Sequence, residues 1–100
     1  MKQAGATEIS NVVVELDGGI PAEAKQYAHD KIAPLGRYAP EPTAFARVRL
    51  TTDGPRAISV HVNMDVNGTS VVAKAEAPTF TEAVDHVHDQ LQNQLLKMHN

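Results

Sequence analysis

The sequence predicts an α+β domain with the element order β-α-β-β-β-α, in which a mixed four-stranded sheet carries two helices packed on one face. Two segments alternate apolar and polar residues, two others have an apolar stripe at helical spacing, and one Asn-Gly pair marks a tight hairpin. At 100 residues, the chain has the size of one domain. We expect residues 1–10 to form a flexible arm and residues 11–100 to form a single domain.

The first strand is predicted over residues 11–16. The β-branched run 12–14 favours extended backbone, and the turn-forming residues 17–19 end the strand. A helix should then lead to the second strand. Such a crossover is right-handed and leaves the two strands parallel if they are neighbours.

The first helix is predicted to begin at Pro21, because the missing N–H of proline costs nothing at the first helical position. Apolar residues then recur at helical spacing, and they are Ala24, Ala28, Ile32 and Leu35. The ring of Pro34 would clash with the carbonyl of Asp30 if the helix continued. The helix should therefore end or bend near Ala33.

Period-two alternation from Thr43 predicts the second strand, with two sets of side chains on opposite faces. One set is Ala44, Ala46, Val48 and Leu50, and the other is Phe45, Arg47, Arg49 and Thr51. The third strand, over residues 58–66, alternates in the same way. The pair 67–68 is Asn-Gly, which favours a type I′ turn, so a fourth strand over residues 69–77 should pair back against the third.

The last helix is predicted from a capping-box signature, Thr79 followed by Glu82. Its apolar stripe consists of Phe80, Val84, Val87, Leu91, Leu95 and Met98. Each helix has one apolar stripe and the sheet has one apolar face. Both helices should therefore cover that face and leave the other face to solvent.

Composition and spacing argue against several classes of function. The chain has no cysteine, which removes disulfides, thiolate metal sites and cysteine nucleophiles. His86 and His88 are two residues apart on the last predicted helix, so their side chains point about 200° apart and do not share a metal. We find no catalytic triad, catalytic carboxylate pair or phosphate-binding glycine motif, and we expect no enzyme activity, metal or cofactor.

The amino end is too short and too polar before Ile9 for a signal peptide, and no apolar run approaches the roughly 18 residues of a membrane span. These features predict a cytoplasmic protein without a membrane partner.

The net charge of -3 argues against a broad basic field, so RNA binding would require the nine Lys and Arg residues to cluster. Two groups of side chains are candidates. The helix set consists of Lys25, Lys31, Arg37, Gln90, Asn93 and Lys97. The sheet set consists of Arg47, Arg49, His61 and Lys74. The residues alone leave both open: the first set could serve solubility, and the second could pair across strands with Asp65 and Glu76.

Two segments carry a resemblance to a known family. One reads YAHDKIAPLGRY from Tyr27, and the other reads VNGTSVVAKAEAPTFTEAVDHVHDQLQNQLLK from Val66. The first segment contains, in order, a Tyr, a Lys-Ile pair, a Leu and an Arg-Tyr pair. The second contains Asn-Gly, alternating Ala, Ala-Val-Asp and a Gln-Leu end. This joint pattern resembles the ribosome hibernation promoting factor and ribosome-associated inhibitor family. The resemblance covers about residues 12–97. The predicted element order is that of the family, and the fold is similar to that of double-stranded-RNA-binding domains.

The resemblance implies a ribosome hibernation factor that silences translation under stress or in stationary phase. It would bind the small ribosomal subunit and its ribosomal RNA in the channel for messenger and transfer RNA. Basic side chains of the two helices would contact phosphates of the ribosomal RNA. The residues that match the family are Lys31, Arg37 and Lys97. At Pro34, Gln90 and Asn93 this chain lacks the basic residues that the family commonly has, so a weaker electrostatic grip is expected.

Long members of the family continue into a second domain that pairs ribosomes, so a second domain or dimer partner outside this chain is possible. The alternative function is a protein–protein interaction module that uses the open sheet face or an edge strand.

Overall fold

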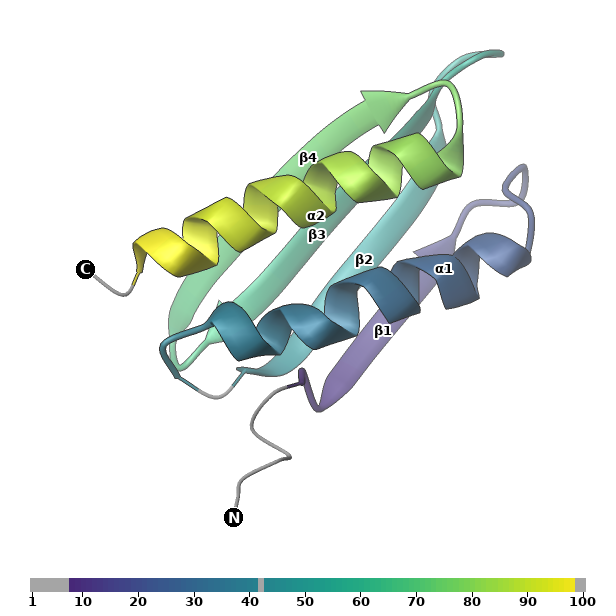
Figure 1. Ribbon diagram of the computed structural model, residues 1–100. Helices are drawn as coiled ribbons and strands as arrows, with labels where there is room; N and C mark the ends of the chain where they lie inside the picture. Colours follow the sequence, from purple (N-terminus) through teal and green to yellow (C-terminus); the bar gives the residue numbers. More distant parts are fainter. Residues whose placement is uncertain (1–7, 42, 99–100) are drawn as a thin grey trace.

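The computed structural model describes residues 8–41 and 43–98, and it has the predicted element order (Figure 1). In chain order the elements are strand β1 (Asn11–Leu16), helix α1 (Glu23–Ile32), the short 3₁₀ helix η2 (Ala33–Tyr38), strands β2 (Thr43–Thr52), β3 (Ile58–Val66) and β4 (Thr69–Ala77), and helix α2 (Phe80–Lys97).

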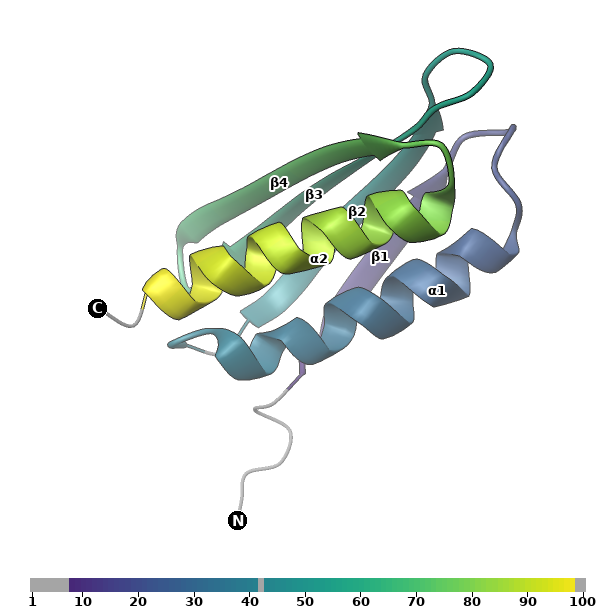
Figure 2. The same ribbon diagram turned by 45° about the horizontal axis from the view of Figure 1, so that its top comes forward.

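The strands form one sheet in the order β1-β2-β3-β4. Strand β1 is parallel to β2, whereas the β2–β3 and β3–β4 pairs are antiparallel. Figures 1 and 2 show both helices on the same face of the sheet, with α1 near β1 and α2 near β4. The predicted mixed sheet with two helices on one face is confirmed. Its opposite face is open to solvent.

The core lies between the helices and the sheet. Helix α2 contributes the fully buried side chains of Val84, Val87, Leu91 and Leu95. They are packed in one cluster with Ile32 from α1 and Leu35 from η2. The sheet contributes Leu50, Val60, Val62 and Met64 to the same cluster. The predicted apolar stripes therefore form the core, and the polar residues between them remain at the surface.

Two turns have the predicted local chemistry. Asn67 and Gly68 both have positive φ values, 49° and 91°, as a type I′ hairpin turn requires. The Thr79 hydroxyl accepts a hydrogen bond from the Glu82 backbone N–H at 3.2 Å and caps α2. These two turns set where β4 and α2 begin.

The predicted start of the first helix is wrong by two residues. Helix α1 begins at Glu23, and Pro21 precedes it. The backbone N–H of Ala24 donates to the Pro21 carbonyl at 3.0 Å, so the proline supplies an acceptor to a tight entry turn. At the other end the α-helix stops at Ile32, and Pro34 lies in the first turn of η2, which confirms the predicted ending.

The beginning of β2 differs from simple alternation. Thr43 pairs with Val66 and Phe45 pairs with Asp65, so Ala44 is an extra residue in a β-bulge. Thr43 is buried and Ala44 is exposed as a result, which reverses the predicted orientation of Ala44. Beyond the bulge, the predicted alternation holds.

The segment expected to be an arm reaches the core at its last residues. Ile9 is buried, and its N–H donates to the Ala33 carbonyl at 2.9 Å. A Cβ on Gly36 would lie 2.8 Å from the backbone of Glu8 and Ile9, so a glycine is needed for this close approach. Residues 1–7 lie outside the described residues.

Candidate nucleic-acid interface

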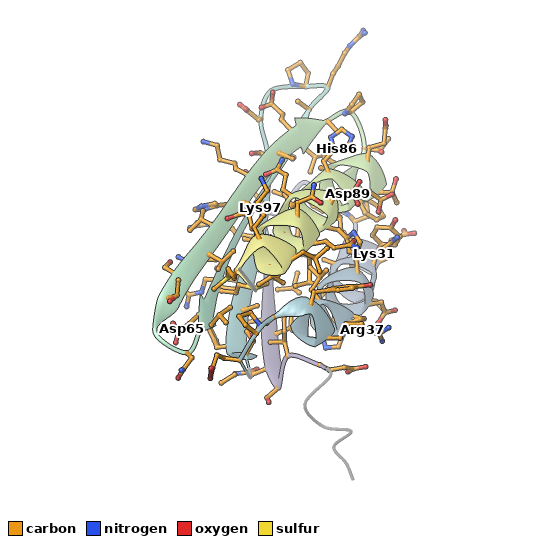
Figure 3. All side chains as sticks on the ribbon, turned by 60° about the vertical axis from the view of Figure 1, so that its left-hand side comes forward. Lys31, Arg37, Asp65, His86, Asp89 and Lys97 are labelled. Carbon is orange, nitrogen blue, oxygen red and sulfur yellow. The ribbon has the colours of Figure 1, made fainter. Side chains whose placement is uncertain are left out.

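The helix set does not gather on one surface. Lys31 lies on the flank of α1 that faces α2, because it contacts Asp85 there. Lys25 is six residues earlier, which places it about 120° away around the helix. Figure 3 shows Lys31 and Arg37 on the α1 side of the molecule and Lys97 on the β4 side of α2. The predicted site residues are therefore divided among three directions.

Lys31 joins the two helices. Its Nζ atom lies 3.5 Å from Oδ1 of Asp85 and 5.7 Å from the centre of the Tyr27 ring. The two charged side chains are 41% and 47% exposed, so the ion pair itself contributes only about 0–1 kcal/mol. Its main effect is positional, since it holds the Lys31 ammonium against a carboxylate.

Tyr27 shares the same carboxylate. Its hydroxyl donates to Oδ1 of Asp85 at 2.6 Å, and its ring packs edge-on against Phe80 with the ring centres 5.9 Å apart. The hydrogen bond to Asp85, followed by desolvation and the charge of Asp85, raises the pKa of Tyr27 to about 12. Asp85 thus orders both Tyr27 and Lys31.

Gln90 has a structural partner. Its side-chain N–H donates to the Lys74 carbonyl at 3.0 Å, and its side-chain oxygen accepts from the Lys74 N–H at 3.4 Å. Gln94 donates to the Val72 carbonyl at 2.9 Å. These two side chains cover backbone groups at the middle of the β4 edge. Asn93 and Lys97 are exposed on the same helix.

The outer surface of the helices is not basic as a whole. Its four cations are Lys25, Lys31, Arg37 and Lys97, and its five carboxylates are Glu23, Asp30, Glu82, Asp85 and Asp89. Charges of both signs are interspersed on this layer, so long-range attraction to RNA is weak there.

The sheet set, in contrast, is contiguous. Arg49 pairs with His61 and His61 pairs with Lys74, so the three side chains form one row across β2, β3 and β4. Arg47 lies two residues before Arg49 on the same face. All four side chains are exposed, and they make no hydrogen bond or ion pair with another described residue.

Of the two carboxylates expected to neutralise the sheet set, Asp65 has another partner, whereas Glu76 also interacts with Lys74. Asp65 accepts a hydrogen bond from the Gly68 N–H at 3.0 Å and lies near the β3–β4 turn (Figure 3). A hydrogen bond with Asp53 raises the pKa of the Glu76 carboxyl, and the nearby charge of Lys74 acts against this rise. The one carboxylate in the basic row is Glu15, which pairs in register with Arg49.

A shallow hollow of about 410 Å³ opens at one end of the sheet set. Its lining consists of Glu15, Leu16, Asp17, Arg47, Arg49 and Thr51. The Gly18 N–H donates to Asp17 at 2.9 Å and the Thr52 hydroxyl at 3.2 Å, and these bonds lower the pKa of the Asp17 carboxyl. The hollow therefore combines two guanidinium groups with a carboxylate that stays ionised at neutral pH.

Two other kinds of site have no counterpart in the described residues. No group of three or more His, Asp or Glu side chains within residues 8–41 and 43–98 is arranged to hold a metal ion. None of the helices in the described part of the chain combines the length and the apolar character that crossing a bilayer requires.

Two features of these surfaces were not predicted from the sequence. They are the contact of Lys31 with Asp85 and the joint action of Gln90 and Gln94 on β4. The spacing of Tyr27 and Lys31, four residues apart on the flank of α1, is the signal that could have pointed to an interhelical contact.

The fold is shared with two solved structures. The N-terminal domain of Protein Y from Thermus thermophilus is 22% identical, with a TM-score of 0.72 and coverage of 91% of this chain and 98% of that chain. A ribosomal subunit interface protein from Coxiella burnetii is 20% identical, with a TM-score of 0.73 and coverage of 89% and 97%. A search of curated proteins found no match.

The family follows from the sequence match. Residues 17–100 match the family described as sigma 54 modulation protein / S30EA ribosomal protein, and the chain belongs to this family. The match spans most of the chain and includes both segments that carried the resemblance. The predicted ribosome hibernation family is thereby confirmed.

Proposed function

We propose that this domain binds the small ribosomal subunit in the channel for messenger and transfer RNA and inhibits translation in stressed or stationary-phase cells. The family match over residues 17–100 carries the proposal. The fold shared with a ribosomal subunit interface protein supports it. The domain acts in the cytoplasm, where its partner is found.

The mechanism is steric. A folded domain in the channel occupies space that messenger and transfer RNA need, so binding alone prevents translation. This mechanism requires no catalysis, metal or cofactor, and affinity comes from contacts between protein cations and ribosomal RNA phosphates.

In the helix set, Lys25, Arg37 and Lys97 are the cations ready to contact phosphates, because no described residue binds their charged groups. Lys31 joins them by exchanging Asp85 for a phosphate, and Asn93 adds an exposed amide. Gln90 keeps its role at the β4 edge and contacts RNA only if those bonds are given up. The few free cations imply a shallow dependence of affinity on salt.

The experiment that tests this function is competition on purified small subunits. Increasing amounts of the domain are added to subunits that carry a labelled short messenger RNA and a labelled initiator transfer RNA. We expect both RNAs to be displaced as the domain binds. Retention of both RNAs on subunits saturated with the domain would show that it binds elsewhere.

A matched pair of variants tests the helix set. Arg37→Glu reverses a charge at the end of η2, whereas Arg56→Glu makes the same change in the loop between β2 and β3. We expect the first variant to need more protein for displacement than the second. Equal displacement by both variants would remove Arg37 from the interface.

The alternative function, a protein-interaction module, has less support at one of its expected surfaces. Gln90 and Gln94 bind backbone groups of Lys74 and Val72, so the middle of the β4 edge is not free to pair with another strand. A second domain or dimer partner outside this chain is compatible with the proposed function and would add affinity through a second contact.

A further inference from the structure

We propose that the open face of the sheet is a second RNA-binding surface, which takes single-stranded RNA. The phosphates of the RNA contact Arg47, Arg49 and Lys74, and one base of the RNA stacks on Phe45. The inference rests on the proposed function, because it adds a ligand surface to a domain that binds the ribosome through its helices.

The basic side chains of the sheet set lie close together on the open face. Neighbouring strands are about 4.8 Å apart, so the row from Arg49 through His61 to Lys74 is only about 10 Å long. Arg47 stands beside this row on β2. Glu15 ends this row at β1, and the same face carries Glu76 beside Lys74 and Asp65 opposite Phe45. The cations therefore lie together at the middle of a face that has carboxylates around them, whereas on the helices carboxylates separate the basic residues.

An aromatic ring is exposed on the same face. Phe45 is 36% exposed and belongs to the outward face of β2, two residues before Arg47 and four before Arg49. An aromatic ring beside arginines on an open four-stranded sheet is the arrangement on which proteins stack unpaired bases. Such a ring binds splayed bases, which a duplex does not present, and therefore the ligand is single-stranded.

The outward side chains of β2 form a path that leads to the hollow. From Phe45 it passes Arg47 and Arg49 and reaches the hollow of about 410 Å³ beside Thr51. The far wall of the hollow carries Glu15 and the ionised Asp17, whose oxygens accept hydrogen bonds from base N–H groups. Phosphates on the arginines would direct the next base toward these acceptors.

The test is fluorescence anisotropy of a labelled 12-nucleotide oligouridine with the purified domain. We expect Phe45→Ala to weaken binding at least about fivefold, because base–aromatic stacking has that effect or a larger one, and Phe45→Tyr to retain it. The matched control is Leu96→Ala, which truncates an exposed apolar side chain on α2. A duplex of the same length should not distinguish Phe45→Ala from the unchanged domain.

The salt dependence tests the cations separately. For single strands the slope of log affinity against log salt is about -0.7 per phosphate contact, so Arg47→Gln with Arg49→Gln should flatten it by about 1.4. Arg56→Gln, in the exposed loop between β2 and β3, should leave the slope unchanged. Equal oligouridine binding by the unchanged domain, Phe45→Ala and the double arginine variant would overturn the proposal. So would sensitivity to Leu96→Ala equal to that of Phe45→Ala.

Small-subunit binding distinguishes this failure from failure of the proposed function. A domain that displaces messenger RNA from small subunits but does not bind oligouridine refutes the sheet surface and leaves the proposed function standing. A domain that binds oligouridine through Phe45 without binding subunits refutes the proposed function and supports the sheet surface. If the sheet variants instead lose binding to an RNA-free protein, the face is a protein-docking surface and the proposal is wrong.

Discussion

Tyr27 and Asp85 are 58 residues apart in the sequence, and their side chains are joined by a hydrogen bond of 2.6 Å between α1 and α2. The same carboxylate oxygen is 3.5 Å from the ammonium group of Lys31. One acidic side chain therefore orients the two helices and also restrains a cation that the proposed function assigns to RNA.

Removing the Tyr27 hydroxyl should lower stability. Tyr27→Phe keeps the ring contact with Phe80 and removes the hydrogen bond to Asp85, so we expect a loss of about 1 kcal/mol in the free energy of unfolding. Urea denaturation at pH 7 measures it. An unchanged midpoint for Tyr27→Phe would mean that the bond contributes nothing.

Tyr27 should also make the stability of the domain depend on pH in the alkaline range. The hydrogen bond to Asp85 raises its pKa from 10.0 to about 12, so between these values the unfolded chain loses the hydroxyl proton first. The unfolded state then binds fewer protons than the folded state, and stability falls as the pH rises from 10 to 12. We expect Tyr27→Phe to lack this part of the alkaline decline when unfolding is measured across that range. Parallel declines in both proteins would contradict the assignment.

Freeing Lys31 should strengthen ribosome binding. Asp85→Asn removes the carboxylate that holds Lys31, and we expect the variant to remain bound to small subunits at higher salt than the unchanged domain. Asp30→Asn is the matched control, because it also removes one carboxylate charge, but the Asp30 side chain binds Gln26 and His29 and makes no ion pair with Lys31. Equal gains for both variants would show that only net charge matters.

Uncovering the β4 edge should promote self-association. Gln90→Ala with Gln94→Ala exposes the backbone groups of Lys74 and Val72, which then offer a template for another strand. We expect concentration-dependent dimers in sedimentation velocity. Gln92→Ala, on a different side of α2, should remain like the unchanged domain. A monomeric double variant would show that the edge is protected by other means.

A methyl group added at Gly36 should lower the stability of the domain. The new Cβ would lie 2.8 Å from the Glu8 and Ile9 backbone, so Gly36→Ala should lower the free energy of unfolding by about 1–3 kcal/mol. Gly18→Ala is the matched control, since no atom lies within 4 Å of its Cβ position. Similar urea midpoints for the two variants would mean that the segment at Ile9 moves away without loss.

The fold could be predicted because local signals and the apolar pattern agree. Alternation in β3, the Asn67-Gly68 turn and the Thr79 cap each depend on neighbouring residues alone. The bulge at Thr43–Phe45 could not be predicted, because it is a register shift between two strands. The start of α1 at Glu23 was missed since Pro21 suits both the first helical position and the turn before it.

The candidate site was less predictable for a geometric reason. Sequence spacing places Lys25 and Lys31 on the polar part of α1 but does not reveal that only Lys31 faces Asp85 on another helix. Gln90 looked like a surface amide, whereas its bonds to β4 depend on how α2 lies over the sheet. Such relationships arise from packing between distant segments, and a single sequence does not contain them in local form.

The most direct test of the central claim is sedimentation of the purified domain with small ribosomal subunits through a sucrose cushion. The proposed function predicts that the domain pellets with subunits at low salt and that the bound fraction falls as salt rises, because the contacts are cations on phosphates. Absence of the domain from the subunit pellet at every salt concentration would contradict the claim that this domain binds the ribosome.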